Sequence, residues 1–428
     1  MSALEKEVAS SADRAGRAHL SSVPTPPPES TAGGSVEGKL LRKLLSFIGN
    51  PAVEFILWTG ERISTARDEI VARIRIADRA TLFSLVKDPH IRFGDAYSEG
   101  RITIDGDLLQ FIETMYKAAP VLPKARKSLA SLLRGAQRQR RNTLNGSKEN
   151  IHHHYDIGND FYKLWLGSTM AYTCAYYPTP ETTLDEAQIA KFDHICQKMQ
   201  LRAGETVVEA GFGWGGLALH MARAYGVKVR AFNISHEQVV FARERAAREG
   251  LGSQLEYVED DYRNITGHYD AFVSVGMLEH VGVENYPQLG GIARQVLGSN
   301  GRGLIHSIGR NRPAPLHPWI TKRIFPGAYP PSLAEFMQIF EPWDFSILDV
   351  ENLRLHYART LIHWLELFDA SANKVRSMFD DKFERMWRLY LAGSIAGFTT
   401  GTLQLFQVLF APKNNNDMAM TRDHLYVR

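Results

Sequence analysis

Short apolar runs alternate with helical patterns along residues 151–428. The runs predict strands, at residues 206–209, 227–232, 255–258, 271–275 and 303–307. Helical patterns lie between them, for example at residues 217–225 and 237–248. Strands that alternate with helices predict an α/β fold with a doubly wound sheet of parallel strands. Ligands in such folds bind beyond the carboxyl ends of the strands, so we expect the functional residues there.

The sequence that precedes residue 151 predicts a disordered tail followed by a small domain. Pro, Ser, Thr and Gly dominate residues 21–35, which predicts a disordered tail over residues 1–36. Residues 37–120 predict a small α/β domain, either for docking and lipid contact or with a structural role alone. Its helical and strand-like stretches are residues 40–48, 54–57 and 72–76. Turns are predicted at Gly94, Gly100 and Gly106.

A basic linker separates the small domain from the alternating block. Residues 117–141 contain eight basic side chains and no acidic one, and residues 121–150 are predicted to form a linker helix. This helix either contacts an anionic membrane surface or is simply solvated. A second mixture of apolar and basic side chains, at residues 319–325, is either a membrane contact or an ordinary cap element.

One uncharged segment, residues 389–412, is long enough to span a bilayer. Polar Ser, Thr and Gln side chains interrupt it, however, and three glycines recur at four-residue spacing, at Gly393, Gly397 and Gly401. Such spacing leaves one helix face flat enough for close packing. We therefore interpret the segment as a helix buried in protein rather than as a membrane span.

Composition narrows the functional classes. The chain has 428 residues, of which 44% are hydrophobic and 23% charged, as expected for a globular protein of two or three domains. Its net charge of +3 is too small for a dedicated nucleic-acid binder. Two cysteines, Cys174 and Cys196, exclude a disulfide framework and favour a reducing, cytoplasmic location. No export signal is visible, and the adjacent histidines at residues 152–154 predict a loop rather than a metal site.

A glycine-rich loop follows the first strand, with glycines at positions 211, 213 and 216. A nicotinamide cofactor would require an acid at the end of the second strand, where this chain has Asn233. The acid is instead Glu209, two residues before Gly211, which is typical of S-adenosylmethionine-dependent methyltransferases. Asn233 and Gln238 are candidates for the ribose, and Asp261, after the third strand, for the adenine amino group. A glycine turn without a ligand is the alternative.

Polar side chains also follow later strands. Glu279 and His306 are expected at neighbouring carboxyl ends, and Cys174 and Tyr357 could complete one polar pocket beside the methyl donor. Each also has a structural explanation, because Glu279 could cap a helix and Cys174 or Tyr357 could be packed in the core. The Asn-Pro-Pro-Tyr signature of base methylation in nucleic acids is missing after the fourth strand.

Several motifs occur together in an order that resembles the cyclopropane-fatty-acyl-phospholipid synthases, relatives of the mycolic acid cyclopropane synthases. Besides the glycine loop, they are residues 154–162, 172–176, 279–282, 306–309 and 357–364. The resemblance covers about residues 40–428. It implies a Rossmann-like class I S-adenosylmethionine-dependent methyltransferase sheet with inserted cap helices over residues 151–428.

The resemblance also implies roles for individual residues. The positions that match a bicarbonate site are Cys174, Glu279, His306, Ile308 through its backbone, and Tyr357. Those that match the surroundings of S-adenosylmethionine are Tyr172, Thr173, Gly211, Gly213, Asn233, Ile234, Gln238, Asp261 and Tyr262. The chain departs from the family at Phe212, where many relatives have cysteine, and at Asn233, where threonine is commoner.

The implied reaction is cyclopropanation of an unsaturated phospholipid acyl chain, with bicarbonate as general base and residues 154–161 as a lid. The resemblance further implies a peripheral enzyme at the inner face of the cell membrane, which contacts its anionic surface, and a homodimer. Within the class, the alternative is a sister methyltransferase whose product is a methylene or methyl-branched chain. A lipid-binding protein with an inactive methyltransferase fold and a nicotinamide oxidoreductase are the alternatives from other classes.

Overall fold

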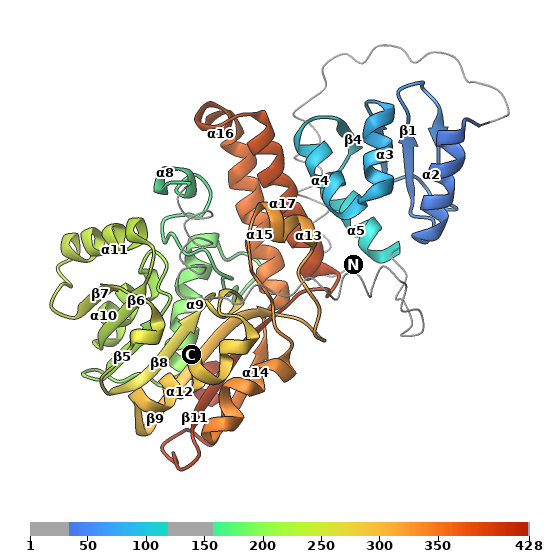
Figure 1. Cartoon of the computed structure of the whole chain (residues 1–428). Coiled ribbons are helices and arrows are strands. Elements are labelled where there is room, and N and C mark those ends of the chain that lie inside the picture. The colour runs from blue at the N-terminus through green and yellow to red at the C-terminus, as the bar shows by residue number, and fades with distance from the viewer. Residues whose placement is uncertain (1–33, 119–156, 427–428) are drawn as a thin grey trace. The chain divides into compact units, whose positions relative to one another are not determined.

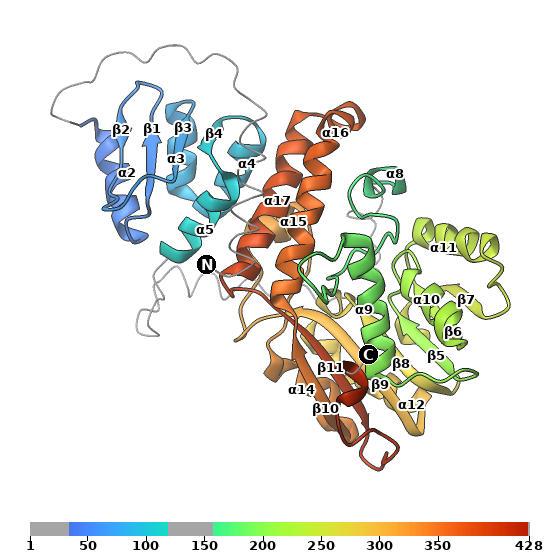
Figure 2. The same cartoon turned by 180° about the vertical axis from the view of Figure 1, so that it is seen from behind.

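The computed structural model describes residues 34–118 and 157–426, which fold into two compact units (Figures 1 and 2). The first unit joins the N-terminal residues to two later segments, His317–Trp319 and Leu361–Thr400. The second unit contains the large sheet. These units divide the chain differently from the predicted boundaries at 37–120 and 151–428, because helix α17 (Asp381–Thr399) packs on helices α4 and α5 of the small domain.

The first unit is built on a four-stranded sheet with the order β2-β1-β3-β4. Its strands are β1 (Val53–Ile56), β2 (Arg62–Ile63), β3 (Ala72–Ile76) and β4 (Ile102–Gly106). Buried and exposed residues alternate along β3, so one face of this strand covers the core. The helices of the small domain are α2 (Val36–Phe47), α3 (Arg79–Lys87), α4 (Pro89–Ser98) and α5 (Leu108–Ala118). The predicted strands at 54–57 and 72–76 are thus confirmed.

Gly94 does not form the predicted turn, since it lies inside helix α4. A Cβ atom at this position would lie 2.4 Å from Nε1 of Trp319, a buried side chain of helix α13 (Pro318–Arg323). The glycine is therefore explained by close packing of the helix against an indole ring. Gly100 and Gly106 do have positive φ angles, of 73° and 122°.

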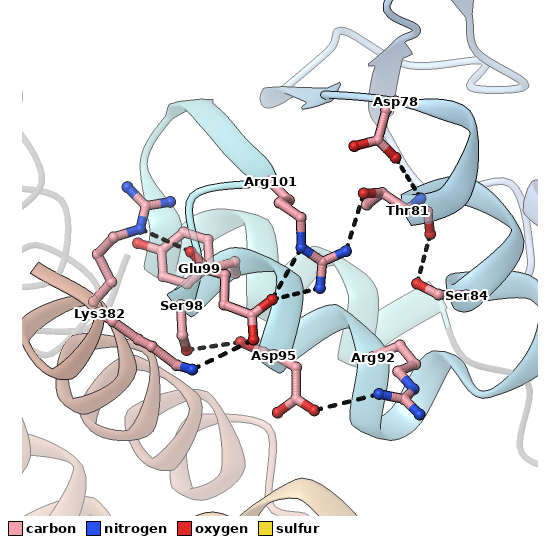
Figure 3. A network of polar contacts seen from close by, with 12 residues as sticks. Asp78, Thr81, Ser84, Arg92, Asp95, Ser98, Glu99, Arg101 and Lys382 are labelled. Carbon is pink, nitrogen blue, oxygen red and sulfur yellow. Dashed lines mark hydrogen bonds and ion pairs between the residues drawn. The ribbon is translucent and has the colours of Figure 1, made fainter.

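Polar contacts connect helix α17 to the end of helix α4 within the first unit (Figure 3). Glu99 accepts a hydrogen bond from the Arg101 guanidinium at 2.9 Å and pairs with Lys382 at 3.4 Å. Arg385 of α17 donates to the backbone carbonyls of Tyr97 and Ile102 and lies over the ring of Tyr97. These contacts fix α17 to the small domain.

The second unit contains a seven-stranded sheet with the order β10-β11-β9-β8-β5-β6-β7. All neighbours pair in parallel except at β11, which is antiparallel to both β9 and β10. The strands are β5 (Thr206–Ala210), β6 (Lys228–Asn233), β7 (Leu255–Glu259), β8 (Tyr269–Val275), β9 (Leu297–Gly309), β10 (Phe345–Asn352) and β11 (Gln404–Pro412). The predicted doubly wound sheet is confirmed.

Helices cover both faces of this sheet. Consecutive residues Val207 and Val208 of β5 belong to two different apolar clusters, because neighbouring side chains of a strand point to opposite faces. One cluster takes in side chains of α9 (Leu184–Lys198), α10 (Gly216–Tyr225) and α11 (His236–Arg248). The other takes in side chains of α12 (Tyr286–Val296) and of α14 (Leu333–Phe340), which is inserted between β9 and β10.

The uncharged segment 389–412 is not one buried helix. It contains the end of α17, a turn at Gly401 with φ of 74°, and the whole of β11. Every residue of β11 is buried, because strands cover it on both edges and helices pack on the sheet, and this explains its lack of charge. Gly401 therefore lies outside the proposed helical stripe. Among the described residues, no helix combines the length and apolarity that a membrane crossing needs.

The remaining helices are shorter or lie towards the end of the chain. They are α8 (Asn159–Tyr162), α15 (Arg354–Ala370), α16 (Ala372–Met378), α18 (Asp423–Tyr426) and the 3-10 turns η1 (Tyr262–Asn264), η2 (Leu278–His280), η3 (Val283–Asn285) and η4 (Glu341–Trp343). Helix α2 begins at Val36, within the predicted tail. The basic linker helix predicted over 121–150 lies outside the described residues.

Candidate active site

The glycine loop joins β5 to helix α10. Its backbone has positive φ angles, which residues with a side chain rarely adopt. Gly211 and Gly213 have φ angles of 82° and 56°. A Cβ atom on Gly211 would lie 2.8 Å from Cβ of Met277, whereas no protein atom lies within 4 Å of the same point on Gly213. Gly211 thus permits close packing inside the protein, and Gly213 leaves its face of the loop open to a ligand.

Asn233 connects the end of β6 to this loop. Its side-chain nitrogen donates to the carbonyl of Gly213 at 3.2 Å and to Oε1 of Gln238 at 2.7 Å. Its side-chain oxygen accepts from the N–H of Ser235 at 3.3 Å, and Ile234 lies between the two residues. The structure therefore brings together three of the residues that the sequence assigns to the cofactor, at the tips of neighbouring strands.

Asp261 and Tyr262 follow β7. The Asp261 carboxylate is held by Arg263, with Nε to Oδ1 at 2.7 Å and Nη2 to Oδ2 at 2.9 Å. The Arg263 N–H also donates to Oδ1 at 2.9 Å, so the carboxylate is fixed and its remaining acceptor capacity lies on Oδ2. The Tyr262 hydroxyl is buried without a hydrogen-bond partner among the described residues, and burial raises its pKa.

Glu209, the next-to-last residue of β5, is a buried carboxylate. Its Oε2 atom has no hydrogen-bond partner in the described parts of the chain, and burial raises its pKa to about 8. Lys191 of α9 opposes this shift by its positive charge, while burial lowers the pKa of Lys191 itself to about 7. A cationic ligand beside Glu209 would stabilise the ionised carboxylate.

Lys191 is a residue that the sequence reasoning missed. It is buried, and its Nζ donates to Oγ1 of Thr173 at 2.8 Å, while Gln188 donates to the Thr173 carbonyl at 2.9 Å. Helix α9 therefore positions Thr173. The sequence does contain a signal for its burial. Lys191 lies on the same helical face as the buried residues Ala187, Gln188 and Ile195.

Glu279 and His306 are buried at the carboxyl ends of β8 and β9. The Glu279 Oε1 atom accepts from the N–H of Ile308 at 2.6 Å, and its Oε2 atom has no partner among the residues described. Burial raises the pKa of Glu279 to about 7 and lowers that of His306 well below its ordinary value. His306 Nδ1 contacts the side-chain nitrogen of Gln407 at 3.1 Å, and its Nε2 atom is unpartnered over the same described ranges.

The segment with Tyr172, Thr173 and Cys174 is attached to the first turns of helix α15. The N–H of Ala175 donates to Oγ1 of Thr360 at 3.0 Å, and the Cys174 sulfur lies 3.8 Å from the carbonyl of Leu353. The backbone N–H of Tyr357 donates to that same carbonyl at 3.1 Å. Cys174 and Tyr357 are therefore neighbours in the fold. Burial raises the pKa of the Cys174 thiol well above its ordinary value, so it is not a thiolate nucleophile.

Aromatic rings pack beside the glycine loop. The ring of Tyr162 lies 4.9 Å from that of Trp214 and 5.6 Å from that of Tyr172, measured between centroids. The indole N–H of Trp214 donates to Asn159 of α8 at 2.7 Å, so the described part of the predicted lid is joined to the loop. Residues 154–156 of that lid, and the histidines at 152–154, lie outside the described residues. Within the described ranges, no group of three His, Cys, Asp or Glu side chains could hold a metal ion.

Comparison with known proteins identifies this arrangement. The mycolic acid cyclopropane synthetase family matches residues 142–408. The chain belongs to this family. Residues 40–126 match a domain family of unknown function.

Among relatives of this family, a probable fatty acid methyltransferase of Pseudomonas putida is 34% identical over 370 residues, which are 80% of this chain and 91% of that protein. The cyclopropane-fatty-acyl-phospholipid synthase of Escherichia coli K12 is 38% identical over 270 residues, 63% and 69% of the two chains. The mycolic acid cyclopropane synthase CmaA1, solved with SAH and CTAB, is 27% identical with a TM-score of 0.58, over 61% of this chain and 97% of that one.

This member of the family is an S-adenosylmethionine-dependent methyltransferase. Its residues fit that cofactor. The open face at Gly213 gives room for it, and the Oε2 atom of Glu209, which has no hydrogen-bond partner among the described residues, has free acceptor capacity for a cationic group. Asn233 and Gln238 add polar atoms at the next strand.

Proposed function

We propose that the enzyme transfers a methylene unit from S-adenosylmethionine across the cis double bond of an unsaturated phospholipid acyl chain, and so forms a cyclopropane fatty acyl chain. Bound bicarbonate is the proposed general base. The observation that carries the proposal is a pair of buried polar atoms, Glu279 Oε2 and His306 Nε2, that have no partner among the described residues. The name of the Escherichia coli relative, a cyclopropane-fatty-acyl-phospholipid synthase, supports the substrate class.

S-adenosylmethionine supplies an electrophilic methyl group when it is bound. The residues proposed to hold it lie on three segments at the strand tips and on the segment before α9. They are Tyr172, Thr173, Glu209, Gly211, Gly213, Asn233, Ile234, Gln238, Asp261 and Tyr262. Glu209 provides negative charge for a cation, and the Asn233–Gln238 pair provides amide groups for hydroxyls.

The buried polar atoms match the hydrogen-bonding pattern of bicarbonate, which when bound supplies a weak base close to the reacting carbon. Ionised Glu279 accepts from a hydroxyl through Oε2, and neutral His306 donates through a ring N–H. Cys174 and Tyr357 are the further proposed contributors. The Ile308 N–H donates to Glu279 in this structure, so its first role is to orient that carboxylate.

A carbocation-like centre on the alkylated chain must be protected from water, which would convert it to an alcohol. The rings of Tyr162, Tyr172 and Trp214 form an apolar cluster beside the glycine loop. Their faces carry negative electrostatic potential and stabilise nearby positive charge. We assign this cluster to the exclusion of water and to the stabilisation of that charge.

The second candidate is a sister reaction on the same kind of chain that yields a methylene or methyl-branched product. The Pseudomonas putida relative favours keeping it, because its name is that of a probable fatty acid methyltransferase and does not specify cyclopropane formation. The two outcomes differ in which proton is removed, and this depends on placement of the base within about an ångström.

The deciding experiment is expression in a bacterial host that lacks cyclopropane lipids, followed by mass spectrometry and NMR of the phospholipid acyl chains. We expect chains heavier by one methylene unit, with the upfield proton signals of a cyclopropane ring. Signals of a new =CH2 group or of a branched methyl group instead would establish the sister reaction. Unchanged chains, with S-adenosylmethionine binding retained, would favour a lipid-binding protein with an inactive fold.

A membrane substrate requires the enzyme to reach the bilayer. We propose peripheral contact with the anionic inner face of the cell membrane, from the cytoplasm, and a homodimer as the resemblance implies. Helix α2 supports the first point, since it exposes Lys39, Lys43 and Phe47. Trp319, which the sequence suggested for such a contact, is buried against Gly94 instead.

A further inference from the structure

Gln407 lies between a histidine and a carboxylate in a row of residues that crosses three strands. Residue pairing aligns Glu351 of β10 with Gln407 of β11, and Gln407 with His306 of β9. Directly paired residues of antiparallel strands project on the same face of the sheet. Gln407 and His306 are both buried, and their side chains meet at 3.1 Å between Nε2 of the amide and Nδ1 of the imidazole.

A neutral imidazole carries one N–H, and its location depends on the partners of the two ring nitrogens. His306 is neutral because burial holds its pKa well below the ordinary value. When the Gln407 amide nitrogen donates to Nδ1, that ring nitrogen must be the acceptor. The proton then lies on Nε2, the ring nitrogen that has no partner among the described residues.

We propose that Gln407 is a positioning residue that holds His306 in the Nε2–H tautomer, so that this histidine donates to the anion of the catalytic site. The identity of the anion as bicarbonate rests on the proposed function, whereas the tautomer does not. Gln407 touches neither cofactor nor substrate in this assignment, and it acts through the imidazole.

The surroundings explain why an uncharged amide occupies this position. The charged or titratable groups whose electrostatic influence reaches His306 are Lys191, Lys198, Glu351 and His194. Glu351 forms an ion pair with Lys198 at 2.6 Å and contacts His194 at 2.7 Å, on the far side of Gln407 in the row. A carboxylate at position 407 would accept from Nδ1–H, which would reverse the tautomer or add a second proton to the ring.

The test is two-dimensional NMR of the full chain labelled with ¹⁵N in histidine, recorded through long-range proton–nitrogen couplings without any ligand. His306→Asn identifies the His306 signals by their loss. We expect the Nε2–H pattern in the wild type, and the Nδ1–H or doubly protonated pattern in Gln407→Glu. Gln407→Met, which keeps the volume and removes the donor, should show a mixture of tautomers. A matched control is Gln404→Glu on the same strand, which should leave the His306 pattern unchanged.

Kinetics connect the tautomer to the reaction. We expect Gln407→Glu to lower turnover by about 10- to 100-fold, the range found when the partner of a metal-binding histidine is lost, and to raise the bicarbonate concentration needed for half-maximal rate. An Nδ1–H pattern in the wild type would overturn the proposal even if Gln407→Glu does not fold. So would a wild-type pattern in both Gln407 variants. If the tautomers are as expected but turnover does not depend on bicarbonate, the proposed general base is contradicted. The role of Gln407 in fixing the His306 tautomer then still holds.

Discussion

Glu279 has one carboxylate oxygen fixed by the Ile308 N–H and one that is buried without a partner among the described residues. Glu279→Gln keeps the size of the side chain but replaces a charged acceptor by an amide that cannot take up a proton. We expect turnover to fall by about 10²- to 10⁴-fold, the range for loss of acid–base function, with no change in affinity for S-adenosylmethionine. Lipid mass spectrometry and calorimetry measure the two quantities. Turnover close to that of the wild type would show that the base pocket is assigned to the wrong residues.

Glu209 makes binding of a cation dependent on pH. Burial raises its pKa to about 8, so the carboxyl is largely protonated at neutral pH and ionises when a cation binds beside it. Binding of S-adenosylmethionine should therefore release protons below pH 8, and affinity should rise as the pH increases towards 8. Calorimetry in buffers of different ionisation enthalpy counts the protons.

The matched variant for this prediction is Glu209→Gln, which should bind more weakly and lose the part of the proton release that belongs to Glu209. Protons from the amino group of the ligand appear in both proteins, so the difference between them isolates the carboxyl group. Equal proton release in the two proteins would place the cation elsewhere.

Individual site residues differed in how well the sequence revealed them. Glu209, Glu279 and His306 could be found because each lies at or just after the end of an apolar strand, and strand ends of a parallel sheet meet at one edge. Lys191 could not, since a lysine in an amphipathic helix is usually solvated and only the fold places its amine beside Thr173. The contact of Gln407 with His306 could not be found either, because the two residues lie on different strands, far apart in sequence.

Two helical glycines of the first unit allow a paired test at the scale of elements. A Cβ atom at Gly94 of α4 would overlap Trp319, whereas a Cβ atom at Gly393 of α17 would meet no atom within 4 Å. We expect Gly94→Ala to lower the free energy of unfolding by about 1–3 kcal/mol through overpacking. Gly393→Ala should leave it unchanged or raise it by up to about 1 kcal/mol through helix propensity. Denaturant unfolding measures both, and equal effects would refute the proposed packing.

Single buried strands could be predicted from the sequence. A long apolar run that joins a helix to a strand could not be divided correctly. Strands β5 and β8 are largely buried on both faces, so each reads as a compact apolar run. The uncharged segment 389–412 also reads as one run, although it contains part of a helix and a strand. Both lie in apolar surroundings, and burial leaves no periodic pattern that separates them.

The division of the whole molecule could not be read from the sequence, because segments far apart along the chain form one unit. Leu361–Thr400 joins the N-terminal unit through contacts such as Arg385 with the carbonyls of Tyr97 and Ile102. A linear reading assigns that segment to the sheet that precedes it. The small domain and the segment therefore depend on one another for burial, and a truncation at residue 360 would expose the faces of α4 and α5 that α17 covers.

Helix α2 provides the whole-molecule prediction about the membrane. Its exposed face carries Lys39 and Lys43, which form no ion pair with any described residue, followed by Phe47 with 74% of its surface exposed. Each basic residue near an anionic surface contributes about 1 kcal/mol, so reversing two of them should weaken binding to anionic vesicles by at least tenfold. Vesicle co-sedimentation of the double variant Lys39→Glu with Lys43→Glu measures this loss.

The double variant Lys228→Glu with Arg248→Glu is the control, because it makes the same change in net charge on exposed residues of the second unit. It should bind anionic vesicles better than the α2 variant does, and neither should differ from the wild type on neutral vesicles. The α2 variant should keep its turnover on detergent-dispersed phospholipid, since its substitutions lie outside the catalytic residues. Equal loss in both double variants would mean that net charge, rather than the face of α2, governs the contact with lipid.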